Sequence, residues 1–159
     1  EEKMPKKSSW TKEQLEMRKS MVTATDIGTI FGINKWKAPL TLWLEKTGRI
    51  EPEPVGEAAL VGIEKEPQVA KAYKKRHRGV RLEKTGTHNE GEFYGATPDR
   101  IVKGDGDPYL LECMTSSVPN MWRGGADPDV YHLQATWQNF AMDLDRWGIF
   151  AELGSRKET

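Results

Sequence analysis

The sequence contains one cysteine, no long apolar run and no net charge. Cys113 alone cannot form an intrachain disulfide or a four-cysteine zinc or iron–sulfur site. No apolar run reaches the roughly 20 residues that span a bilayer, and residues 1–7 lack the apolar core of a secretory signal, so we expect a cytoplasmic protein with no membrane contact. The 24 Lys and Arg residues balance the 24 Asp and Glu residues. Any contact with nucleic acid therefore depends on local clusters of positive charge.

The length of 159 residues is typical of a single domain that buries its own core. We expect one domain over 1–159, with 1–8 as a flexible N-terminal tail. A first helix is expected over 10–19, and a second follows the cap signal at 23–26 and ends at Gly32. A third is expected from Pro39 to Gly48, and a fourth over 57–78 with a kink or break at Pro67. The residues expected to face inward on the second and third helices are Ile27, Ile30, Phe31, Leu40, Trp43 and Leu44.

After Gly79 the pattern changes to short strands, predicted over 80–83, 92–96, 100–103 and 109–115, with a turn over 104–108. A loop over 116–129 leads to a helix over 130–144, and a last strand is predicted over 147–153. Leu133, Trp137, Phe140 and Ala141 are expected on the inner face of that helix. Helices followed by strands, then a helix and a strand, predict an α/β fold with a small central mixed β-sheet flanked by helices.

Two acids stand out in the strand region. Asp99 ends the run Thr97-Pro98-Asp99, and Glu112 lies inside a strand of apolar residues. A charge buried in such a strand costs several kcal/mol unless an ion or hydrogen-bond donors compensate it. Two carboxylates from neighbouring strand ends can share Mg²⁺ or Mn²⁺, because these ions prefer oxygen ligands and keep exchangeable waters. The alternative from the residues alone is a turn acid and an edge-strand acid, both solvated.

The motifs also occur in an order that resembles the YqaJ-type viral recombinases, which are related to phage lambda exonuclease in the PD-(D/E)xK nuclease superfamily. The matching elements are Arg18 with 23–32, 39–43, the Gly-x-x-x-Glu of 62–66, the two acid motifs at 96–99 and 111–113, and the late Pro128, Tyr131 and Gln134. The resemblance covers the chain from Arg18 to about Leu153. Each motif is weak by itself, and the ordered set is fairly specific.

The resemblance implies a restriction-endonuclease-like core that digests linear double-stranded DNA 5′→3′, leaving 3′ single strands for a partner annealing protein during phage recombination. It implies Mg²⁺ or Mn²⁺ as cofactor, and a phage or prophage gene in a bacterial host. Relatives imply either a monomer or a homotrimer. A DNA end with a 5′-phosphate is the implied substrate.

Residue roles follow from the same resemblance. Asp99, Glu112 and the backbone carbonyl of Cys113 would bind the metal, and Glu66 would act on it directly or through water. Gln134 would orient the attacking water or a phosphate. The residues implied at the 5′-phosphate are Arg18, Thr25 and Lys35.

Each of these residues also has an ordinary structural interpretation. Glu66 can pair with Lys65 or Lys71 on a helix surface, and Thr25 can simply cap a helix. The basic run over 71–78 can be a solvated face or a phosphate-binding one. The tryptophans Trp36, Trp43 and Trp137 are expected in or near the core, although Trp36 beside two lysines can also stack on an unpaired base.

The family pattern Glu-x-Lys requires lysine at position 114, where this chain has Met114. Methionine keeps the length of lysine but has neither charge nor hydrogen-bond donor, and losing one such group commonly lowers a rate about a hundredfold or more. We therefore expect an impaired nuclease that still binds metal and DNA, unless another lysine such as Lys71 or Lys74 reaches the site. The alternatives are a DNA-end-binding module that does not cut and an endonuclease of the same fold.

Overall fold

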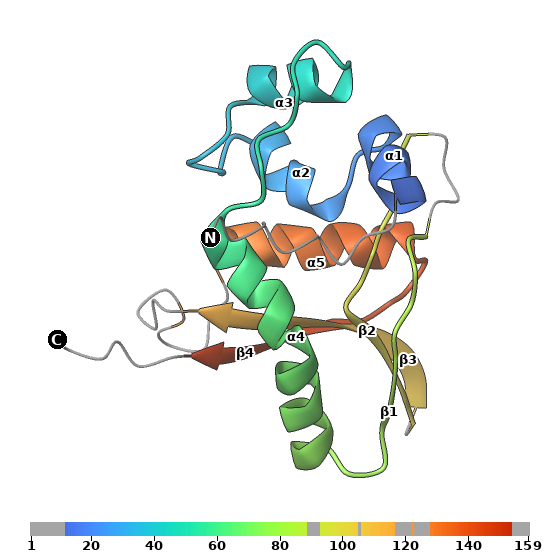
Figure 1. The fold of residues 1–159 in the computed structure, drawn as a ribbon. Helices are drawn as coiled ribbons and strands as arrows, with labels where there is room; N and C mark the ends of the chain where they lie inside the picture. The colour runs from blue at the N-terminus through green and yellow to red at the C-terminus, as the bar shows by residue number, and fades with distance from the viewer. Residues whose placement is uncertain (1–11, 89–92, 105, 117–121, 123–127, 154–159) are drawn as a thin grey trace, which may run out of the picture.

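A four-stranded mixed sheet with strand order β1-β2-β3-β4 lies at the centre of the molecule (Figure 1). The computed structural model describes residues 12–88, 93–104, 106–116, 122 and 128–153. The strands are β1 (Arg81–Glu83), β2 (Arg100–Gly104), β3 (Gly106–Ser116) and β4 (Trp147–Leu153). The first three pair antiparallel, and β4 pairs parallel with β3. The predicted mixed sheet is therefore confirmed.

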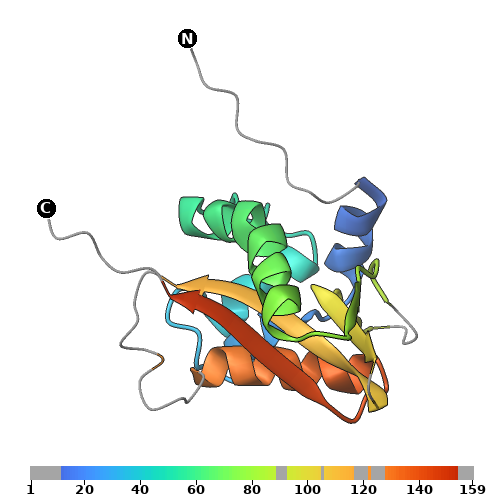
Figure 2. The ribbon, with the colours of Figure 1, turned by 90° about the horizontal axis from the view of Figure 1, so that it is seen from below.

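Helices cover both faces of this sheet (Figures 1 and 2). Helix α4 (Glu57–Arg76) packs on one face, where Val69 and Tyr73 meet Leu111 in the main apolar cluster. Helix α5 (Asp129–Ala141) covers the other face. Strand β3 has a strand on each side and a helix on each face, which explains why its apolar run is continuous rather than alternating. The middle of β3 is the most deeply buried part of the sheet, with Leu110 at 0% and Leu111 at 1% exposure.

Three short helices form a further layer outside α5: α1 (Lys12–Ser20), α2 (Ala24–Ile30) and α3 (Pro39–Lys46). Helix α2 packs directly on α5 at Gly28, where a Cβ atom would come within 2.9 Å of Val130 Cγ2. Thr23 and Asp26 form the predicted cap of α2, because Asp26 Oδ2 accepts hydrogen bonds from the Thr23 backbone N–H and hydroxyl, both at 2.8 Å.

The segment before Asp99 joins this helical layer to the sheet. Val22 N donates to Phe93 O at 2.7 Å, and Gly95 N donates back to Val22 O at 3.0 Å. Gly95 has no room for a side chain, since a Cβ atom would lie 2.4 Å from Met21 Sδ and 2.7 Å from the His88 carbonyl oxygen. The strand predicted over 92–96 is wrong for its described residues: Tyr94 and Ala96 form only isolated bridges. Each faces a single loop residue, so no ladder develops; Glu92 lies outside the described residues.

The predicted inner faces of the helical layer are partly wrong. Ile27 is buried and Leu44 is half-buried, but the other four are exposed, at 47% for Ile30, 67% for Phe31, 65% for Leu40 and 46% for Trp43. Trp36, in the loop between the two helices, is 85% exposed. Helix α3 instead buries Leu42 and Glu45. Glu45 is tolerated there because Lys37 Nζ lies 2.7 Å from its carboxylate. The buried face of α3 thus contains an ion-paired acid beside Leu42, a combination that apolar periodicity does not predict.

Smaller differences concern element ends. Strand β3 begins at Gly106, so it includes part of the predicted turn, and α4 continues as one helix through Pro67. Helix α5 ends at Ala141, just before Asp143 with its φ of 50°, and Phe140 is 63% exposed rather than buried. Residues 1–8 and most of the loop predicted over 116–129 lie outside the described residues. None of the helices that the structure describes has both the length and the hydropathy to cross a membrane.

Candidate metal and DNA-end site

The two predicted acids meet at the start of β2. The antiparallel register pairs Arg100 with Leu111, so Asp99 comes level with Glu112 although 13 residues separate them in sequence. Asp99 Oδ2 accepts a hydrogen bond from Cys113 N at 2.8 Å, and the Glu112 carboxylate accepts one from the Asp99 backbone. These two bonds to neighbouring backbone N–H groups hold the two carboxylates beside each other.

Both carboxyl groups are buried, and burial changes their protonation. Burial, opposed by the Cys113 hydrogen bond and assisted by Glu66, raises the pKa of Asp99 to about 6. Burial, together with the neighbouring Asp99, raises the pKa of Glu112 well above its ordinary value. Desolvation favours the neutral acid, and a second carboxylate nearby favours it further. Burial and the mutual repulsion of the two carboxylates therefore both favour their protonated forms, and a positive charge beside them would oppose this shift.

Helix α5 supplies a residue that the sequence interpretation missed. Gln138 is 4% exposed, and its side chain hydrogen-bonds the Glu112 carboxylate. Even so, Glu112 Oε1 and Gln138 Oε1 are both buried without a hydrogen-bond partner in the described part of the chain. Gln138 follows the predicted Gln134 by one helical turn, so both lie on the same face of α5. This spacing is the sequence signal that could have identified Gln138.

Gln134 and Met114 come level with each other by register. Helix α5 runs antiparallel to β4, and therefore to β3, because only five residues connect α5 to β4. Four helical residues and two strand residues each advance about 6 Å. Since Gln138 contacts Glu112, Gln134 lies at the height of Met114, which shares a strand face with Glu112. A lysine at position 114 would thus extend along the strand face that carries Glu112.

Glu66 approaches the acids from α4, on the opposite face of the sheet. Its Oε1 forms an ion pair with Arg100 Nη1, which also donates to the Asp99 carbonyl oxygen. The charge of Glu66 contributes to the raised pKa of both Asp99 and Glu112. The structure therefore brings Glu66 into the acid cluster that it was predicted to join.

The residues present fit a divalent cation in charge and donor type. The cluster offers hard carboxylate oxygens, and the unpartnered Glu112 Oε1 is the kind of buried atom that a cation would satisfy. No three acidic, histidine or cysteine side chains among the described residues converge closely enough to enclose an ion as they stand. Asp99 and Glu112 lie beside each other, whereas the carboxylate of Glu66 is paired with Arg100.

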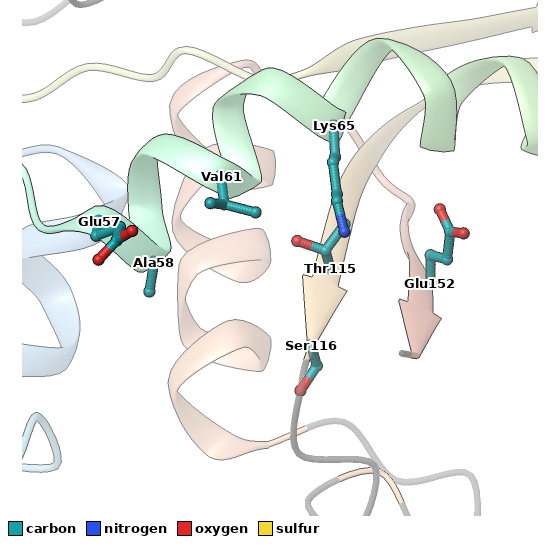
Figure 3. A pocket seen from close by; sticks show the side chains of 7 residues that line it. All are labelled: Glu57, Ala58, Val61, Lys65, Thr115, Ser116 and Glu152. Carbon is teal, nitrogen blue, oxygen red and sulfur yellow. The ribbon is translucent and has the colours of Figure 1, made fainter. Parts of the chain in front are cut away.

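No cation replaces the missing lysine at Met114 among the residues proposed for that role. Lys71 and Lys74 are exposed on α4, and neither has a recorded contact with the acids. Lys65 of the same helix lines a hollow of about 450 Å³ between α4 and the ends of β3 and β4, where it extends toward Thr115 (Figure 3). Lys84 is exposed, and its charge acts on Asp99 from a distance.

The predicted phosphate-binding residues are only partly brought together. Arg18 Nη2 lies 3.4 Å from Thr25 Oγ1 at the start of α2. Burial lowers the pKa of Arg18 and Asp26 opposes this. Lys46, which was not predicted, connects the end of α1 to the start of α2, because its Nζ contacts Asp26 Oδ2 and the Arg18 carbonyl oxygen, both at 2.7 Å. Lys35 is exposed in the loop after α2 and has no recorded contact with Arg18 or Thr25.

Comparison with known proteins agrees with this architecture. The fold is similar to the crystal structure of an alkaline exonuclease (LHK-Exo) from Laribacter hongkongensis, with a TM-score of 0.72 and 21% identity over 90% of this chain and 74% of that one. The same enzyme in complex with dAMP gives a TM-score of 0.73 at 21% identity, over 89% of this chain and 73% of that one. The sheet, its flanking helices and this likeness identify an α/β restriction-endonuclease-like fold.

Sequence comparison places the chain in a family. It is 37% identical over 127 residues to the YqaJ protein of Bacillus subtilis (strain 168). This match covers 77% of the chain but only 39% of that protein, so the chain spans about two fifths of the length of its relative. The model of the YqaJ-like viral recombinase domain matches residues 13–140. The chain therefore belongs to the YqaJ-like viral recombinase domain family.

Proposed function

We propose that this chain is the nuclease domain of a Mg²⁺- or Mn²⁺-dependent exonuclease that digests linear double-stranded DNA 5′→3′ in phage-type recombination, with activity impaired by Met114. The observation behind this proposal is the buried pair of Asp99 and Glu112 with its unpartnered Glu112 oxygen. A carboxylate pair of this kind is unfavourable in a core without a cation.

In this proposal Asp99, Glu112 and the carbonyl of Cys113 hold the metal ion. When bound, the ion would lower the pKa of a coordinated water and neutralise the charge that grows on the phosphate. The protein residues then have separate tasks. Gln138 orients Glu112, and Gln134 directs the water or a phosphate oxygen at the height of residue 114.

The role of residue 114 follows from its height on β3. A lysine there would add a positive charge and a hydrogen-bond donor beside Glu112, where both would stabilise the attacking water and the developing charge. Met114 supplies packing only. The chain is therefore expected to bind DNA ends and metal but to hydrolyse slowly.

Arg18 and Thr25 are proposed to hold the 5′-phosphate at the start of α2. Their side chains lie 3.4 Å apart, and Thr25 is exposed, so a phosphate can bridge them at the helix N-terminus. Lys35 would contact the same DNA strand only at a phosphate that follows the terminal one. The 3′ single strand left behind would serve a partner annealing protein.

The decisive experiment compares the chain with Met114→Lys on 5′-phosphorylated linear duplex in Mg²⁺ and in Mn²⁺. We expect the lysine variant to release nucleotides at least about a hundredfold faster. Met114→Leu is the matched control, because it changes the side chain without adding charge, and it should stay slow. Met114→Lys combined with Asp99→Asn should also be inactive. No digestion by the lysine variant with either metal would disprove the exonuclease proposal.

Met114 itself favours a second candidate, a module that binds DNA ends without cutting them. In that case the lysine variant would bind the duplex end as tightly as the parent and remain inactive. Covalently closed circular DNA separates the remaining alternative, since an endonuclease would cut circles and an exonuclease would leave them intact.

A further inference from the structure

Arg100 is a buried cation whose contacts all lie within the acid cluster. It begins β2, is 9% exposed, and pairs with Leu111 on the sheet face covered by α4. Its Nη1 donates both to Glu66 Oε1 and to the Asp99 carbonyl oxygen. The two ion-paired side chains are only 11% and 16% exposed. Such a pair is held firmly, because separating it would leave a buried charge without a partner.

The Arg100–Glu66 ion pair separates the role of Glu66 from those of Asp99 and Glu112, the two acids proposed to bind the metal. Glu66 has its Oε1 committed to Arg100, while Glu112 Oε1 has no partner in the described part of the chain. The Asp99 carboxylate is held by the Cys113 backbone and the Glu112 carboxylate by the Asp99 backbone, whereas the Glu66 carboxylate is held by Arg100. The third acid is therefore positioned by Arg100 and not by the other two.

We propose that Arg100 is a positioning residue that keeps Glu66 out of direct contact with the divalent cation, so that Asp99 and Glu112 alone supply carboxylate ligands and Glu66 acts through water. This inference rests on the proposed metal site and decides between the two roles that the family resemblance left open for Glu66. Arg100 also brings a positive charge into the cluster through its ion pair with Glu66, and it acts on Asp99 through space, in a chain without the lysine at position 114.

Calorimetric titration of the full chain with Mn²⁺ tests the proposal without requiring catalysis. Glu66→Gln should change the Mn²⁺ affinity by less than about threefold, because the side chain is not a direct ligand. Arg100→Gln should tighten Mn²⁺ binding about tenfold, since it removes a positive charge and frees a carboxylate that can then bind the ion. That gain should disappear in the double variant with Glu66→Gln, and Arg100→Lys, which keeps the charge, should restore the parent affinity to within about threefold.

Lys84→Gln is the matched control, because it also removes one positive charge that acts on Asp99 but is exposed and not bound to Glu66. It should alter the affinity by less than about threefold. Equal tightening by Lys84→Gln, or tightening that persists without Glu66, would reduce the effect to general electrostatics and overturn the proposal. A large loss of Mn²⁺ affinity in Glu66→Gln would also overturn the proposal. Because this variant keeps Arg100, it provides a test even if Arg100→Gln does not fold.

Failure of the underlying metal site has a different signature. Asp99→Asn should weaken Mn²⁺ binding by more than about thirtyfold. If that variant binds Mn²⁺ like the parent, the ion does not use these acids and the proposed function fails together with this inference. If Asp99→Asn loses the ion while Glu66→Gln also loses it, only the role of Arg100 is wrong.

Discussion

Two partly buried carboxylate clusters in the described part of the chain differ in how their charge is compensated. Asp26, in the α1–α3 layer, receives hydrogen bonds from the Thr23 backbone and hydroxyl, and Lys46 Nζ lies 2.7 Å from it. At the sheet, Asp99 accepts a hydrogen bond from the Cys113 backbone, and Glu112 has hydrogen bonds with the Asp99 backbone and Gln138. Both acids nevertheless have a raised pKa, and Glu112 keeps an unpartnered oxygen. Within the described residues, the first cluster has a lysine beside its carboxylate, whereas the second keeps an unpartnered carboxylate oxygen.

This difference separates a structural role from a functional one. Lys46 joins three parts of the helical layer, because it also donates to the carbonyl oxygens of Arg18 and Met21. Arg100 compensates only part of the charge of Glu66, Asp99 and Glu112. A fold selected for stability alone would bury neither acid of the second cluster. The contrast can be tested in four ways.

The largest expected effect is on metal binding. Glu112→Gln should lower the Mn²⁺ affinity at least about a hundredfold, because it removes one of the two direct carboxylate ligands. Asp26→Asn, in the first cluster, should leave the affinity unchanged within about twofold. Calorimetric titration measures both. Comparable losses in the two variants would show that the clusters do not differ as described.

The second effect is on stability and concerns the first cluster. Lys46→Met should lower the free energy of unfolding by about 2 kcal/mol, because Asp26 and two backbone carbonyls lose their partner. Lys19→Met is the control, since its pair with Glu16 is at the surface and should contribute much less than the Lys46 contacts. Urea denaturation monitored by tryptophan fluorescence provides both values, and equal changes would contradict a structural role for Lys46.

The third effect is a pH dependence of the metal-free protein. The pKa of Asp99 is about 6, above its ordinary 3.8, so the folded state binds a proton that the unfolded state releases over this range. Stability should therefore rise as the pH falls from about 7.5 to about 5, by about 1 to 2 kcal/mol. The double variant Asp99→Asn with Glu112→Gln should lose this rise. Urea denaturation at each pH measures the free energy of unfolding. The same pH dependence in the parent and in the double variant would exclude a contribution from these two acids.

The smallest effect concerns the DNA end. In the Met114→Lys background, Arg18→Gln should reduce the preference for a 5′-phosphorylated over a 5′-hydroxyl duplex about threefold to tenfold, because one charge–phosphate contact is lost. Lys19→Gln, next in the chain and exposed, should keep the preference. Digestion rates of the two duplexes give the ratio. An unchanged ratio in Arg18→Gln would remove Arg18 from the phosphate site.

The sequence predicted the sheet and the two acids because both depend on local patterns. Asp99 and Glu112 stand at fixed places relative to β2 and β3, and strand pairing alone brings them together. Gln138 and Arg100 could not be assigned in this way. The role of Gln138 depends on how α5 is rotated about its axis, and that of Arg100 depends on where α4 crosses the sheet; neither rotation nor crossing is encoded in one segment.

The errors in the helical layer have a related cause. Helix α3 has apolar side chains on more than one face, so periodicity did not determine which face would be buried. The buried face contains Leu42 and Glu45, the partner of Lys37, and Leu40 and Trp43 remained outside. Long-range ion pairs of this kind leave no periodic signal in the sequence.

The backbone hydrogen bonds between Val22 and residues 93–95 connect the segments that carry the two proposed sites. Thr25 follows Val22 by three residues and Asp99 follows Gly95 by four, so both proposed sites are attached to the same pair of hydrogen bonds. A terminal phosphate bound beside Thr25 would be presented to the acids at one constant offset, whatever the base sequence of the DNA. Because Gly95 leaves no space for a side chain, that offset cannot be altered by substitution at the junction itself. The position of the cleaved bond relative to the bound DNA end would then depend on this backbone junction as well as on the side chains of the two sites.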